Sequence, residues 1–109
     1  MITKKKLINT LESLGWAVST NKETGEIKYI ENYSPAGEDL VIDIYETDLQ
    51  DIVDTIKNSC SNYDADDHAE MWAEHRGTNG VPWSIRELID DADAIGEMYN
   101  ELYNKMCEL

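Results

Sequence analysis

The segment from Trp16 to Tyr45, WAVSTNKETGEIKYIENYSPAGEDLVIDIY, decides the fold class. Apolar and polar residues alternate along it with the period of two that half-buried β-strands have. Two groups of turn-forming residues, 21–25 and 34–39, interrupt the alternation, and the second contains a proline and a glycine. The segment therefore predicts three strands joined by two short turns, in an antiparallel meander.

The alternation also predicts which side chains share a face. In the first two strands it groups Trp16 with Val18 and Thr20, and Ile27 with Tyr29 onward toward Tyr33. In the third strand one face is expected to carry Leu40, Ile42 and Ile44, and the other Val41, Asp43 and Tyr45.

One helix is predicted before this sheet and one directly after it. Thr3 can cap the first, in which Leu7, Leu11 and Leu14 share a face, and Gly15 supplies the left-handed residue that commonly ends a helix. After the third strand, the helix is expected to begin at a capping box and to end near residues 58–62. The box is made by Thr47 and Gln50, and the inward positions are Leu49, Ile52, Val53 and Ile56.

Two further helices are predicted in the last part of the chain. Asp64 can cap one that stops at Gly77, and Ser84 with Glu87 forms a capping box for the longest, whose apolar stripe runs over 85–106. The fold class is therefore α+β, in the order α-β-β-β-α-α-α. With 109 residues, 41% of them hydrophobic, the chain can build one core, so we predict a single domain over residues 1–109.

The two cysteines, Cys60 and Cys107, match no C-x-x-C pattern. The chain opens with a lysine triplet, residues 4–6, and no cleavable apolar leader is recognised. Its apolar runs are shorter than the ~20 residues that a membrane-spanning helix needs. We expect reduced thiols and a cytoplasmic protein.

Charge is the unusual feature of the composition. The 23 acidic residues exceed the nine basic ones, for a net charge of −14. Residues 1–30 hold five Lys and three Glu, a net of +2, whereas residues 31–109 hold 20 acids and four bases, a net of −16. Such a field repels nucleic acid and anionic membranes and attracts basic protein grooves.

The acids of the later helices mostly recur every three or four residues, so they form stripes opposite the apolar faces. Each stripe is compatible with an ordinary solvated helix face, and acids in a first helical turn also favour the helix dipole. Taken together, the stripes and one aromatic residue near them are our candidate partner-binding residues: Asp48, Asp51, Asp54, Asp66, Asp67, Glu70, Glu74, Asp90, Asp93, Glu97, Glu101 and Trp83.

Catalysis and metal binding find little support in the sequence. His68 and His75 are seven residues apart, about 10 Å along a helix, which is too far to share one zinc ion without a third element. The sequence contains no phosphate loop, dinucleotide fingerprint or nucleophile elbow. We predict no catalytic residue, no metal site and no cofactor.

Three segments carry a resemblance to known proteins: residues 31–39 (ENYSPAGED), 64–72 (DADDHAEMW) and 76–88 (RGTNGVPWSIREL). They resemble small acidic proteins carried by phages and mobile elements of Gram-positive bacteria. In size and charge the chain resembles anti-CRISPR inhibitors of Cas9 and antirestriction proteins, some of which are acidic mimics of DNA. This resemblance implies anti-defence activity in the cytoplasm of a bacterial host.

The leading hypothesis is a non-enzymatic inhibitor whose acidic surface occupies the basic DNA-binding groove of a nuclease such as Cas9. Residues four apart on a helix rise about 6 Å, close to the distance between successive phosphates of one strand. The alternative is an acidic adaptor or homodimer that pairs through the apolar stripe of residues 85–106 and Trp83. A third possibility is a small enzyme or nucleotide-sequestering protein with a pocket at His68 and Trp72.

Overall fold

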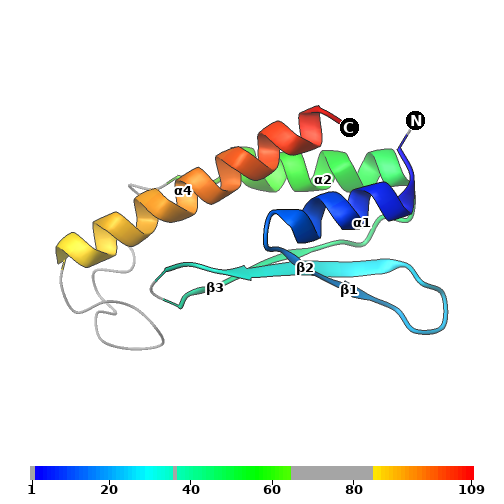
Figure 1. Ribbon diagram of the computed structural model, residues 1–109, viewed down its shortest axis with the longest axis horizontal. Helices are drawn as coiled ribbons and strands as arrows, with labels where there is room; N and C mark the ends of the chain where they lie inside the picture. The colour runs from blue at the N-terminus through cyan, green and yellow to red at the C-terminus, as the bar shows by residue number, and fades with distance from the viewer. Residues whose placement is uncertain (1, 36, 65–84) are drawn as a thin grey trace.

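The computed structural model describes residues 2–35, 37–64 and 85–109 (Figure 1). The elements follow in the order α1 (Lys4–Ser13), β1 (Ala17–Thr20), β2 (Ile27–Tyr33), β3 (Asp39–Asp43), α2 (Leu49–Ser61) and α4 (Ile85–Cys107). This order confirms the predicted mixed α+β fold. The helix predicted from Asp64 to Gly77 and the cap predicted at Ser84 lie outside the described residues, apart from Asp64 itself.

The described elements form two layers. The three strands make one antiparallel sheet in the order β1-β2-β3, which is the predicted meander. The helices α1, α2 and α4 all lie on one side of this sheet (Figure 1). None of the described elements covers the opposite face of the sheet.

Helix α1 begins and ends where the sequence predicts. The Thr3 hydroxyl accepts a hydrogen bond from the Lys6 backbone N–H at 3.1 Å, and Leu7 and Leu11 are fully buried. Gly15 follows the helix with φ of +91°, a left-handed conformation that a side chain would strain. The chain can therefore turn at once from α1 into the sheet.

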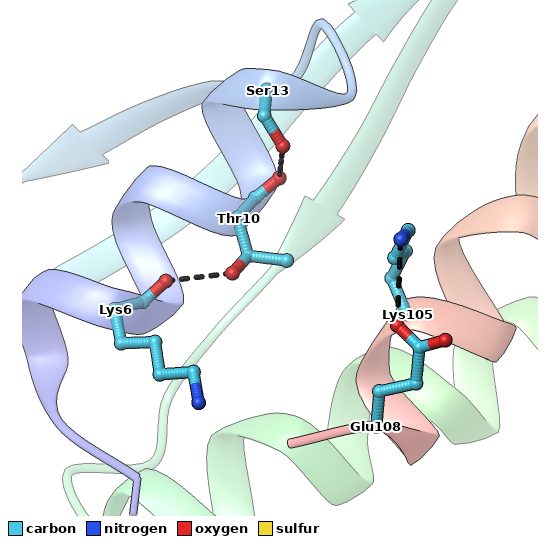
Figure 2. A network of polar contacts seen from close by, with 5 residues as sticks. All are labelled: Lys6, Thr10, Ser13, Lys105 and Glu108. Atoms are coloured by element: carbon cyan, nitrogen blue, oxygen red, sulfur yellow. Dashed lines mark hydrogen bonds and ion pairs between the residues drawn. The ribbon is translucent and has the colours of Figure 1, made fainter.

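Figure 2 shows local hydrogen bonds within α1 and an ion pair at the end of α4. The hydroxyls of Thr10 and Ser13 donate to the carbonyls of Lys6 and Thr10, at 2.8 and 2.6 Å. Near the end of α4, Lys105 Nζ lies 3.4 Å from Glu108 Oε2. These contacts are local, so they organise the helix ends and not the core.

The second strand departs from the predicted alternation. Ser19 pairs with Tyr29, but Thr20 pairs with Ile27, so Lys28 is an extra residue in β2. This β-bulge places both Ile27 and Ile30 in the core, whereas Tyr29 stays 37% exposed. The prediction that Ile27 and Tyr29 share a face was therefore wrong. In β3 and the residues just after it, Leu40, Ile42 and Ile44 are buried as predicted.

The cap of α2 also differs from the prediction. The Asp48 carboxylate, not the Thr47 hydroxyl, accepts from the backbone N–H groups of Gln50 and Asp51, at 2.9 and 3.2 Å. Both residue types cap helices well, but the helix starts at Leu49, which puts Asp48 in the capping position. The capping box predicted between Thr47 and Gln50 is therefore wrong by one residue.

The core fills the space between the sheet and the helices. Helices α2 and α4 run antiparallel (Figure 1). The start of α2 lies beside Leu109, which follows α4. At the other end, the Tyr63 hydroxyl, just after α2, donates a hydrogen bond to the Ala92 carbonyl of α4 at 3.2 Å. The rings of Trp16 and Tyr99 pack against each other in this layer in a tilted arrangement, with centroids 6.0 Å apart. Among the described residues, the fully buried aliphatic side chains are Leu7, Leu11, Ile30, Val53, Ile56, Ile95 and Leu102.

Candidate interaction surface

The acids predicted on the last helix lie on its solvent side. Asp90, Asp93, Glu97 and Glu101, which we call the α4 stripe, are all exposed. The opposite side of the same helix is buried through residues such as Ile95, and Leu102 and Met106 follow it at helical spacing. The apolar face of α4 thus fixes the direction of the stripe.

The α4 stripe has no partners within the described part of the chain. The four carboxylates take part in no hydrogen bond or ion pair with another described residue. Lys105 is four residues after Glu101 and could pair with it, but it contacts Glu108 instead (Figure 2). From Asp90 to Glu101 the stripe spans about 16 Å of helix, so it is a continuous, uncompensated line of negative charge.

The acids of α2 have a different environment. Asp48 caps the helix, and Asp54 accepts a hydrogen bond from the Gln50 side chain at 3.1 Å. Asp51 is exposed in the first turn, where a negative charge favours the helix dipole. Interactions within α2 therefore explain why acids occur at these positions.

The two described stripes do not lie alongside each other. Because α2 and α4 are antiparallel, Asp48 lies near Leu109 at the far end of α4, away from Asp90 and Asp93. The other predicted partner-binding residues lie outside the described residues: Asp66, Asp67, Glu70, Glu74 and Trp83. His68, Met71, Trp72 and His75 also lie there, and with them the pocket considered at His68 and Trp72.

A buried polar cluster joins the β2–β3 turn to α4, and the sequence analysis did not find it. The Ser34 hydroxyl donates to the Asp91 carboxylate at 2.9 Å and accepts from the Glu38 backbone N–H at 3.0 Å. All three residues are buried, at 5% exposure for Ser34, 6% for Asp91 and 7% for Glu38. Asp91 precedes Ile95 by four residues, so the two residues share the apolar side of the helix. An acid at such a position in the sequence indicates a buried carboxylate.

Burial and charge change the acidity of this cluster. Burial, together with the charge of the nearby Asp91 carboxylate, raises the pKa of Glu38 to about 7. Burial also raises the pKa of Tyr63, whose hydroxyl reaches the neighbouring turn of α4. The cluster thus holds a glutamate that is partly protonated at neutral pH.

A cavity of about 460 Å³ lies between the end of α2 and the middle of α4. Its aromatic lining is Tyr63, Tyr99 and Tyr103, with Tyr63 and Tyr99 ring centroids 5.1 Å apart. Cys60 also lines it, but burial raises the pKa of this thiol to about 12, so it stays protonated and is a poor nucleophile. Cys107, in contrast, is exposed.

Among the described residues, no group of three or more His, Cys, Asp or Glu side chains could hold a metal ion, and no helix is long and apolar enough to cross a membrane. The apolar stripe of α4 from Ala92 to Met106 packs within its own chain, so a homodimer would need a different surface for most of its contacts.

Comparison with known protein families, with curated proteins and with solved structures finds no match for this chain.

Proposed function

We propose that the protein inhibits a nuclease by placing the α4 stripe in the enzyme's basic DNA-binding groove, where it excludes DNA. The observation that carries this proposal is the uncompensated line of Asp90, Asp93, Glu97 and Glu101 on a helix that is anchored by its opposite face. A rigid helix presents these charges at fixed spacing, so little ordering is required on binding. The protein acts by occupation, without catalysis.

The choice of target rests on charge and on resemblance. A net charge of −16 over residues 31–109 complements a groove built to hold phosphates. The three resembling segments link the chain to small acidic phage and mobile-element proteins, and its size and charge resemble those of anti-CRISPR and antirestriction proteins. Cas9 in the cytoplasm of a bacterial host is therefore the target to test first.

The test measures inhibition of DNA cleavage by a Cas9–guide complex and competition with DNA, each at two salt concentrations. Because a basic groove must give up its counterions, the affinity is expected to fall roughly tenfold to a hundredfold between about 50 and 200 mM salt. Antirestriction activity is tested in the same way with restriction nucleases. Absence of binding to every nuclease, or binding that salt leaves unchanged, contradicts the proposal.

A pair of charge-matched variants locates the contact. Replacing Asp93, Glu97 and Glu101 with lysine should abolish inhibition. The control replaces the exposed Glu12, Glu23 and Glu26 with lysine, which changes the net charge by the same amount on another part of the molecule. If both variants lose inhibition equally, net charge and not the α4 stripe is responsible.

A further inference from the structure

The outward face of the sheet is a second surface with its own chemistry. Its two neighbouring strands β2 and β3 carry three aromatic or aliphatic residues and three acids, which we call the outer sheet face: Tyr29, Glu31, Tyr33, Asp39, Val41 and Asp43. Tyr33 is 58% exposed, Val41 43% and Tyr29 37%. None of the described elements packs on this face (Figure 1).

The register of the strands arranges these residues in a regular pattern. Tyr29 lies directly opposite Asp43, and Tyr33 lies directly opposite Asp39. Glu31 lies between the two tyrosines along β2. Each exposed ring therefore has a carboxylate beside it, at the spacing of about 5 Å between strands and about 7 Å along a strand.

The acids of this face crowd one another. A hydrogen bond and charge repulsion from Asp39 raise the pKa of Glu31, and the charges of Glu31 and Asp39 raise the pKa of Tyr33. The three strands hold a single cation, Lys28 at the bulge, against three acids. A cation placed among these groups would relieve their repulsion, whereas a nucleic acid or a second copy of this face would increase it.

From this arrangement we infer that the outer sheet face binds an extended, arginine-rich segment of a partner protein. A guanidinium group is planar, stacks on a tyrosine ring and makes paired hydrogen bonds to a carboxylate beside it. Arginines at alternate positions of an extended segment recur at about 7 Å, which matches the spacing of Tyr29, Glu31 and Tyr33. This surface is distinct from the α4 stripe and does not depend on the nuclease proposal.

The experiment measures binding of two short peptides to the full chain, one alternating arginine with serine and one alternating lysine with serine. The arginine peptide should bind at least about fivefold more tightly, since lysine cannot reproduce stacking with paired hydrogen bonds. Amide chemical shifts should move in β2 and β3. Equal affinity for the two peptides, absence of binding, or shifts confined to α4 would overturn the inference.

Variants separate ring stacking from charge. Tyr33→Ser and Asp39→Asn should each weaken binding of the arginine peptide about fivefold, whereas Tyr33→Phe, which keeps the ring, should retain it. Glu12→Gln on α1 removes the same charge as Asp39→Asn from an exposed site outside both surfaces, and should change binding less than about twofold. Unfolding curves verify that each variant folds. If Glu12→Gln weakens binding as much as Asp39→Asn, the attraction is only that of net charge and the inference is wrong.

The mass in solution gives a further check. Sedimentation should show a monomer, with or without the arginine peptide. A dimer that Tyr33→Ser dissociates would assign the outer sheet face to a second copy of the chain and overturn the inference. Failure here would leave nuclease inhibition by the α4 stripe intact, because that proposal is tested with DNA competition and different variants.

Discussion

Helices α2 and α4 both carry acids every three or four residues, but the structure uses the two sets differently. On α2, Asp48 caps the helix and Asp54 accepts a side-chain hydrogen bond. On α4, the four stripe carboxylates take part in no hydrogen bond or ion pair with another described residue, whereas their neighbour Asp91 is buried against Ser34. Acids at the same sequence spacing therefore divide into a structural set and an exposed set, and only the exposed set is a good candidate for binding a partner.

The largest effect is expected from the buried face that directs the α4 stripe. Ile95 is completely buried, so Ile95→Ala should lower the free energy of unfolding by about 2–5 kcal/mol through lost burial and the cavity it leaves. Ile89, which is 46% exposed, is the matched control, and Ile89→Ala should cost less than about 1 kcal/mol. Urea unfolding measures both. Similar losses for the two variants would mean that α4 does not pack through the Ile95 side.

The buried carboxyl cluster predicts a dependence on pH. Glu38 has its pKa raised from 4.5 to about 7, so the folded chain binds its proton more tightly than the unfolded chain does. Stability should therefore fall as the pH rises from about 4.5 through 7, by on the order of 1–3 kcal/mol. Glu38→Gln mimics the protonated form, so it should remove this loss and be more stable than the natural chain at pH 8.

The comparison for this prediction is the exposed Glu97, since Glu97→Gln removes the same charge from the surface. Thermal unfolding at pH 5 and pH 8 is measured for both variants. If Glu38→Gln and Glu97→Gln have the same pH dependence, Glu38 does not titrate in the folded protein with a raised pKa.

The capping role of Asp48 predicts a smaller effect. Asp48→Ala leaves two backbone N–H groups at the start of α2 without their acceptor, and should cost about 1 kcal/mol. Asp48→Asn keeps a capping oxygen and removes the charge, so it should cost little. Urea unfolding decides between the roles, because equal losses in both variants would show that the charge of Asp48 and not its cap stabilises α2.

The smallest effect on folding is expected for the α4 stripe itself. Replacing Asp90 and Asp93 with Asn, and Glu97 and Glu101 with Gln, should change the free energy of unfolding by less than about 0.5 kcal/mol, or raise it slightly by relieving repulsion. The same variant should lose nuclease inhibition. A loss of several kcal/mol would place these acids in the structural set with Asp48 and Asp91.

The sequence predicts the fold well where local patterns decide it. Alternation at Leu40, Ile42 and Ile44 identifies β3, and Thr3 with Gly15 marks both ends of α1. It fails at the bulge, because nothing in the residues before Tyr29 distinguishes Lys28 as the extra one until β1 is paired with β2. It also misplaces the cap of α2, where Thr47 and Asp48 are both suitable and adjacent.

The candidate sites also differ in how far the sequence alone predicts them. The α4 stripe is a property of one helix, so its exposed side follows from the spacing of apolar residues alone. The Ser34–Asp91 contact joins residues that are 57 positions apart, and the pairing of Tyr33 with Asp39 depends on the register of β2 and β3. Contacts of that kind are set by tertiary packing, which a single sequence does not encode in any short pattern.

The contrast between the two cysteines makes the chain suitable for site-specific labelling. Cys107 is exposed at the end of α4, while Cys60 is buried with a pKa of about 12, so a maleimide dye at neutral pH should modify Cys107 alone. The label would lie more than one helical turn beyond Glu101, close enough to report on a partner and outside the stripe itself. Fluorescence titrations of nucleases and arginine peptides can then use the natural sequence without an introduced cysteine.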